Sequence, residues 1–151
     1  MKGALIMSNS DKISELKSLL TRLVDSRDGY QDAAEHARQT RHQKMFTDLS
    51  SQRNEYALKL QDYLNRQGEN IELDGSFLAG VHRFFMEIKN KLGDDEELME
   101  AIITGESELL DCYREAMEDA NYDTELLTTL QSQYRTIESN LNLIEAKEEA
   151  A

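Results

Sequence analysis

Apolar residues recur along most of this chain at intervals of three and four residues, the spacing that places them on one face of an α-helix. The chain contains no proline, so no proline ring interrupts these helical stretches. With seven glycines and no proline among 151 residues, it also lacks the turn residues that β-sandwiches and β-barrels need. The sequence therefore predicts an all-α protein with a single domain.

The same spacing predicts four long helices, with short turns after the first and after the third. Each short turn joins two antiparallel helices, so the chain is expected to form two hairpins. Between the hairpins, a long crossover carries a short amphipathic helix over residues 76–92. This connectivity is that of a ferritin-like four-helix bundle. The expected helices run over residues 10–39, 40–67, 94–120 and 125–146.

We expect the bundle to occupy residues 10–146, followed by a frayed tail at 147–151. Residues 1–9 are expected to be disordered or left over from cloning, with Met7 as plausible a natural start as Met1. Within the first helix, Gly29 is expected to cost about 1 kcal/mol relative to alanine. Thr40 is expected to cap the second helix, and the acidic run at 94–97 is expected to begin the third.

Charge excludes one class of partner. The chain has 30 acidic and 17 basic residues, a formal net charge of −13, and nucleic-acid binding requires a basic surface. Cys112 is the only cysteine, so no intramolecular disulfide can form, which is typical of a reducing cytoplasm. The apolar runs are too short for a transmembrane segment. We therefore expect a cytoplasmic protein with neither a nucleic-acid partner nor a membrane span.

Two charged residues occupy positions where the helical pattern requires apolar ones. Arg53 stands between Leu49 and Tyr56 on the second helix, and Glu106 stands at the corresponding place on the third. A lone buried charge costs several kcal/mol, so we expect the two to form a core ion pair through a bidentate contact. The alternative is that both lie at the edge of the apolar face and reach water. Further candidate members of the network are Arg27, Tyr30, Tyr56, Tyr113 and Tyr134.

Motifs for catalysis and cofactor binding are missing. A di-metal site in a helical bundle uses two E-x-x-H pairs, and none of the three histidines follows a glutamate by three residues. No G-x-G-x-x-G, phosphate-loop or G-x-S-x-G motif occurs. Cys112 is expected to fill space at the edge of the core. We therefore predict no catalytic residues, no cofactor and no metal site.

Several segments resemble a bacterial family of ferritin-like four-helix-bundle proteins of unknown function that is related to rubrerythrin. The most specific are S-F-L-A-G-V-H-R-F-F at 76–85 and the Gly105-Glu106 pair followed by Tyr113, and the likeness extends over residues 10–146. The resemblance implies the bundle fold and a bacterial cytoplasm, but no activity. It also implies that Glu106 is the one position with metal-ligand chemistry.

The sequence departs from the rubrerythrin pattern at the other ligand positions. Arg53 and Tyr56 stand where the second helix would carry E-x-x-H, Leu23 stands near the glutamate of the first helix, and Leu141 replaces a histidine in the last. An arginine at a metal position suggests that Arg53 replaces the cation as the counter-charge to Glu106.

Three functions follow from these observations. We expect a non-enzymatic helical bundle with a structural or interaction role associated with stress. The first alternative is a metal-binding ferritin-like oxidoreductase or peroxidase, and the second is a membrane-surface or partner-binding module that uses the 77–92 helix. The metal alternative would combine Glu106 with Glu35, His36, Glu108 or Glu138.

The crossover helix is rich in large apolar side chains that are costly to expose. We therefore expect a homodimer, although the same helix could instead seal one flank of the bundle. The candidate interface residues are Phe77, Val81, Phe84, Phe85 and Ile88.

Overall fold

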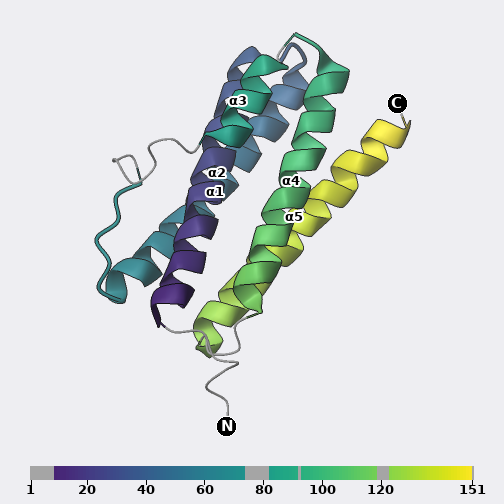
Figure 1. Ribbon diagram of the computed structural model, residues 1–151. Coiled ribbons are helices and arrows are strands. Elements are labelled where there is room, and N and C mark those ends of the chain that lie inside the picture. Colours follow the sequence, from purple (N-terminus) through teal and green to yellow (C-terminus); the bar gives the residue numbers. More distant parts are fainter. Residues whose placement is uncertain (1–8, 74–81, 92, 119–122, 151) are drawn as a thin grey trace.

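The computed structural model describes residues 9–73, 82–91, 93–118 and 123–150, and within these ranges the chain consists of helices joined by turns and irregular segments, without a strand. The all-α class predicted from the sequence is confirmed. In chain order the helices are α1 (Asn9–His36), α2 (Thr40–Arg66), α3 (Arg83–Asn90), α4 (Asp95–Met117) and α5 (Thr124–Ala150), as Figure 1 shows.

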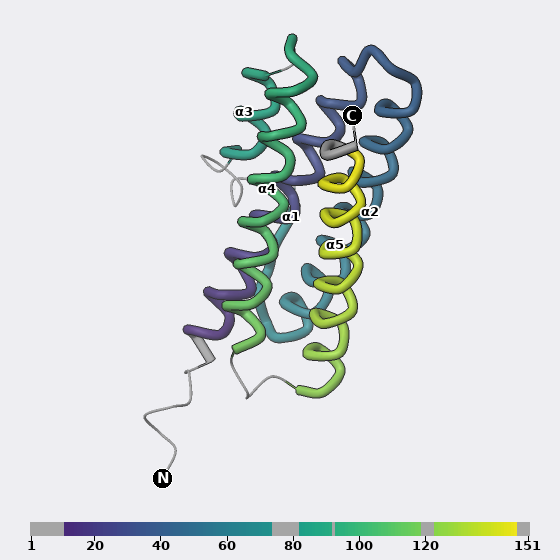
Figure 2. Tube along the Cα trace, turned by 90° about the vertical axis from the view of Figure 1, so that its right-hand side faces the viewer, coloured from purple at the N-terminus to yellow at the C-terminus, as the bar shows by residue number. Residues whose placement is uncertain are grey.

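The four long helices form two hairpins, α1 with α2 and α4 with α5, and the hairpins contact each other through α1 and α4. The short helix α3 lies on α1 and α4, near the end of the bundle where α1 ends and α4 begins (Figure 1, Figure 2). It therefore seals this flank of the molecule, which is the alternative role considered for the crossover helix. No helix in the described part of the chain is both long enough and apolar enough to cross a membrane.

Most helix boundaries agree with the predicted ones to within a few residues, and the differences have local causes. The N-cap of α2 is Gln39, so Thr40 is the first helical residue rather than the cap. Asp94 caps α4 by accepting a hydrogen bond from the Glu97 N–H at 3.0 Å. The crossover helix begins at Arg83, and its predicted part at 76–81 lies outside the described residues.

The last helix does not end at residue 146 but continues to Ala150. The segment consists of alanine, glutamate and lysine, which are all good helix formers, so the helix continues into the tail that is expected to fray.

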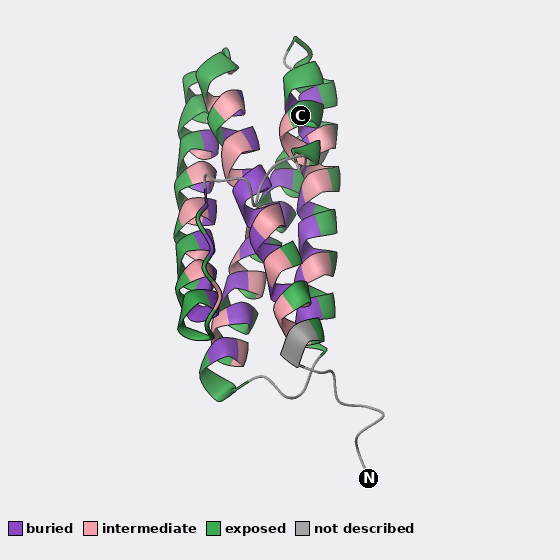
Figure 3. Cartoon of the chain, turned by 60° about the vertical axis from the view of Figure 1, so that its left-hand side comes forward, coloured by how far each residue is buried: buried purple, intermediate pink, exposed green. Residues whose placement is uncertain are grey.

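Buried residues recur along all four long helices (Figure 3). They form two apolar clusters. One is built mainly from leucines around Leu20 and Leu130, and the other is built around Tyr30, Phe46, Ile88 and Ile102. Arg53 and Glu106 belong to neither cluster: each stands in its helix between residues of the two. The core therefore has a polar layer at mid-height.

Candidate functional site

The polar layer is centred on Arg53 of α2 and Glu106 of α4, whose side chains meet inside the bundle. Arg53 Nη1 donates to Glu106 Oε1 at 2.6 Å, and Arg53 Nη2 donates to Glu106 Oε2 at 2.8 Å. The side chains are 0% and 1% exposed, so neither charge reaches water. Such a bidentate contact matches the planar guanidinium fork to both carboxylate oxygens. The structure thus brings together the two charged residues on the helical stripes.

Further polar groups extend the layer to all four long helices. Arg53 Nη1 also donates to the Ser26 hydroxyl of α1 at 2.9 Å, and Arg53 Nε donates to Gln52 Oε1 at 3.1 Å. The same Gln52 oxygen accepts from Asn140 Nδ2 of α5 at 3.2 Å. The apolar pattern does not single out Gln52 or Asn140. Ser26 could have been found, because it lies three residues after Leu23 and four before Tyr30 on the stripe of α1.

The carboxylate of Glu106 favours the charged form of Arg53. Burial is the largest single influence on the pKa of Arg53 and lowers it, but the charge and the hydrogen bonds of Glu106, together with the nearby Tyr30 and Tyr113, raise the pKa overall. A guanidinium is charged at any pH relevant to a protein, so the layer always holds a cation.

Of the four candidate tyrosines, Tyr30 and Tyr113 are fully buried. Only the ring of Tyr30 packs against the guanidinium of the ion pair. The Tyr30 ring has Arg53 Cζ over it at 5.4 Å from its centre, yet its buried hydroxyl has no hydrogen-bond partner among the described residues. Burial, and then the charge of Glu106, raises the pKa of Tyr30 well above its ordinary value. Tyr113 donates instead to Gln133 Oε1 at 2.6 Å. Tyr56 is half-buried, and Tyr134 accepts from Arg114 Nε at 3.1 Å.

The residues proposed for a metal site are not assembled around Glu106. Their side chains lie at the surface, and no group of three or more His, Cys, Asp or Glu residues in the described ranges is placed to hold a metal. Both oxygens of Glu106 are engaged by a permanently charged guanidinium, which excludes a second cation from the same position. The donor set therefore does not fit a di-metal centre. The exposed residues are Glu35, His36, Glu108 and Glu138.

Two other candidates from the sequence also lie away from the pair. Arg27 donates from Nε to Asp28 Oδ1 at 2.9 Å and from Nη1 to Asn54 Oδ1 at 3.1 Å, so it is not a third member of the buried layer. Cys112 is half-buried on α4, and burial raises its pKa to about 11. Its thiol is therefore protonated at neutral pH, which is unfavourable for a nucleophile.

The apolar residues considered for a dimer interface are partly used within the chain itself. Ile88 is fully buried in a core cluster, and Phe84 packs against the same cluster. Ile88 is therefore not available to a partner, because the flank of α1 and α4 already covers it. Phe85 is half-buried, and Phe77 and Val81 lie outside the described residues.

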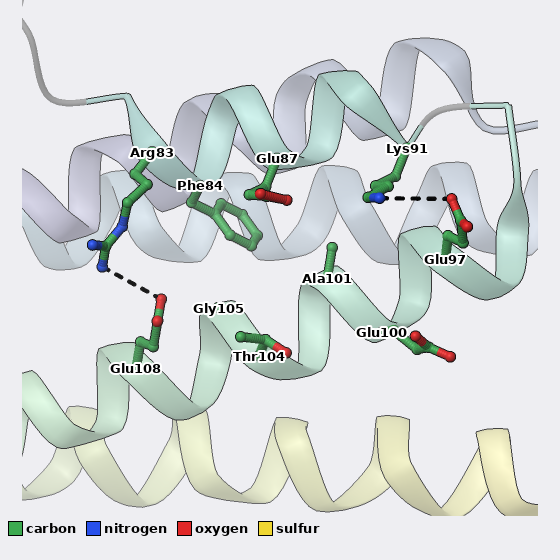
Figure 4. A pocket seen from close by; sticks show the side chains of 10 residues that line it. All are labelled: Arg83, Phe84, Glu87, Lys91, Glu97, Glu100, Ala101, Thr104, Gly105 and Glu108. Atoms are coloured by element: carbon green, nitrogen blue, oxygen red, sulfur yellow. Dashed lines mark ion pairs between the residues drawn. The ribbon is translucent and has the colours of Figure 1, made fainter.

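A shallow groove of about 470 Å³ runs between α3 and α4 (Figure 4). Phe84, Ala101 and Gly105 are among its apolar lining residues, and an ion pair stands near each end. Arg83 Nη2 lies 3.6 Å from Glu108 Oε1, and Lys91 Nζ lies 3.7 Å from Glu97 Oε2. Among its lining residues the only hydroxyl belongs to Thr104, and none of them is a histidine or cysteine.

A second buried carboxylate belongs to Asp25 of α1. The spacing of apolar residues in the sequence does not mark this position as part of the core. It is 2% exposed and accepts hydrogen bonds from the Phe84 N–H at 2.7 Å and the Phe85 N–H at 3.0 Å. These are backbone donors at the N-terminus of α3, where a helix needs acceptors from outside its own ladder. Asp25 therefore caps a helix that lies almost sixty residues further along the chain.

The titration of Asp25 is expected to make the fold lose stability as the pH rises. Burial raises the pKa of Asp25 above its ordinary value of 3.8, whereas the two backbone N–H groups and the charges of His82 and Arg22 lower it. The folded state thus binds this proton more tightly than the unfolded state. The contribution of this proton to the free energy of unfolding is complete below the pKa that Asp25 has in the unfolded chain. It is lost as the pH rises through the higher pKa of the folded state.

The measurement is the difference in free energy of unfolding between the natural chain and Asp25→Asn, by urea denaturation from about pH 3 to about pH 7. The stability of the natural chain relative to the variant should fall with rising pH. A relative stability that rises over this range would contradict the expectation.

The fold and the site together define a class of protein, an all-α bundle of four long helices with a bidentate ion pair in its core. The chain belongs to the family described as a domain of unknown function, DUF2383, whose profile matches residues 11–119. The matched range contains most of α1 and all of α2, α3 and α4, and it ends before α5. No curated protein and no solved structure matches the chain.

Proposed function

We propose that this chain is a non-enzymatic ferritin-like bundle, in which the Arg53 guanidinium takes the place of the metal ions as counter-charge to Glu106. The observation that carries the proposal is the bidentate contact, because it uses both oxygens of the only buried glutamate among the described residues. The two hairpins and the crossover between them support the ferritin-like arrangement. The resemblance to rubrerythrin-related proteins supports a bacterial, cytoplasmic setting.

A structural or interaction role agrees best with this geometry. The polar layer links all four long helices, so it can fix their register, which is the best-attested use of buried polar groups. The association with stress rests on the sequence-based expectation alone. The homodimer likewise stays a prediction, and the exposed large apolar residues in the described ranges that could take part are Leu58, Met86 and Leu143.

Metal analysis tests the proposal. The natural chain, expressed and dialysed in the presence of iron or manganese, should retain far less than one metal ion per chain. Arg53→Glu combined with Tyr56→His creates an E-x-x-H pair on α2 and removes the buried cation. If circular dichroism shows that it folds, this variant should retain more metal than the natural chain. Stoichiometric metal in the natural chain that is lost in Glu106→Gln would overturn the proposal.

A further inference from the structure

The helical state of α3 depends on groups outside its own sequence. It has eight residues, and its N-cap residue, His82, supplies no side-chain cap within the described part of the chain. The cap comes from Asp25 of α1, through the N–H groups of Phe84 and Phe85. Helices this short are not stable alone in water. Docking and helix formation in α3 are therefore one event.

Phe84 is the wedge that seats α3 on the bundle. Its ring lies between Gly29 of α1 and Gly105 of α4, where a Cβ on either glycine would overlap the ring. The ring packs edge-on against Tyr30, with 5.3 Å between ring centres, and Tyr30 in turn lies under the Arg53 guanidinium. Phe84, Tyr30 and Arg53 thus form a continuous stack from the groove at the surface to the buried ion pair.

Few side chains of α3 are buried against the long helices. Ile88 is its only fully buried side chain among the described residues, and Phe84 and Phe85 are half-buried. The ion pairs to Glu108 and Glu97 are substantially exposed, and such pairs contribute little. The long helices, by contrast, each bury several large side chains. Detaching α3 should therefore require much less free energy than unfolding the bundle.

We propose that α3 is a strap that detaches as a unit from an intact four-helix bundle and thereby controls access to the Arg53–Glu106 layer. When it opens, the amides of Phe84 and Phe85 lose Asp25, and Phe84 leaves the notch between the two glycines. Tyr30 becomes the outermost residue of the stack, and its ring gains access to water. This device is independent of the proposed function, because it requires only the docking contacts of α3.

Amide hydrogen exchange measures the opening directly. In the natural chain, the amides of α3 should exchange much faster than those at the centres of α1 and α4. Asp25→Ala should accelerate exchange in α3 about tenfold, the effect of losing a good helix cap, and leave the centres of the long helices unchanged. Asp94→Ala is the matched control, since it removes an exposed cap and should affect only the first turn of α4. Equal exchange in α3 and the long helices would overturn the proposal, as would equal acceleration throughout by Asp25→Ala.

Nitration with tetranitromethane, mapped by mass spectrometry, tests the seal on the ion pair. Tyr30 and Tyr113 are both fully buried, but only Tyr30 lies beneath Phe84. Tyr30 should therefore be nitrated faster than Tyr113 in the folded protein, and Asp25→Ala or Phe84→Ala should widen this difference. If the two tyrosines react at the same rate in every variant, the bundle opens only as a whole and the strap does not exist.

Discussion

Replacing Glu106 by alanine is expected to lower the free energy of unfolding by about 3–5 kcal/mol, and Arg53→Ala is expected to cost a similar amount. Each substitution leaves the other charge buried without its partner, since the two side chains are 1% and 0% exposed. Arg53 would retain only the neutral acceptors Ser26 and Gln52, which cannot replace a carboxylate. Urea denaturation monitored by circular dichroism gives both values.

A double-mutant cycle separates the ion pair from the general cost of mutating the core. Arg53→Ala with Glu106→Ala should cost clearly less than the sum of the two single losses, because neither charge is then left alone. Glu108→Ala, two residues away on α4, is the matched control and should change stability by no more than about 0.5 kcal/mol, since its side chain is 48% exposed. Two small and additive losses from the single variants would mean that both groups reach water.

Replacing Gly105 by alanine is expected to destabilise the protein by about 1–3 kcal/mol, although glycine to alanine inside a helix ordinarily stabilises by about 1 kcal/mol. The added methyl group would overlap the ring of Phe84. The opposite edge of the ring lies against Gly29, where an ideal Cβ position would be only 2.5 Å from Phe84 Cδ2, so the ring has little room to shift while α3 stays docked. Gly29→Ala should therefore show the same inverted sign.

Comparing Gly105→Ala in chains with and without Phe84 shows whether the overlap with the Phe84 ring causes the loss of stability. In a Phe84→Ala chain the notch is empty, and Gly105→Ala should then stabilise, as it does in an ordinary helix. Gly93→Ala is the control for the natural background, since no atom of the described chain lies within 4 Å of its Cβ position. The measurement is the melting temperature of each variant. If Gly105→Ala raised the melting temperature with Phe84 present, the Phe84 ring would not fill the space at Gly105.

The helices and the two unusual positions on them are properties of local sequence. Spacing of three and four residues predicts helical faces without knowledge of their partners, so the all-α class and most helix limits could be predicted. The same spacing marks Arg53 and Glu106 as charges at core positions. It does not give the distance between the two side chains, because that distance depends on how the α4–α5 hairpin is positioned along the α1–α2 hairpin.

Only the tertiary structure shows which residues cap the crossover helix α3 and which residues form the space that it fills. Asp25 caps α3 across about sixty residues, and Phe84 occupies a notch built from Gly29 and Gly105 on two different helices. These contacts leave no repeating pattern in the sequence, because each joins single residues from elements that are distant along the chain. In the sequence Gly29 is merely a weak point in a helix, and in the folded protein its missing side chain is the space that Phe84 fills. Periodicity reports which face of a helix is buried, whereas the partner of that face is set by packing between elements distant in sequence.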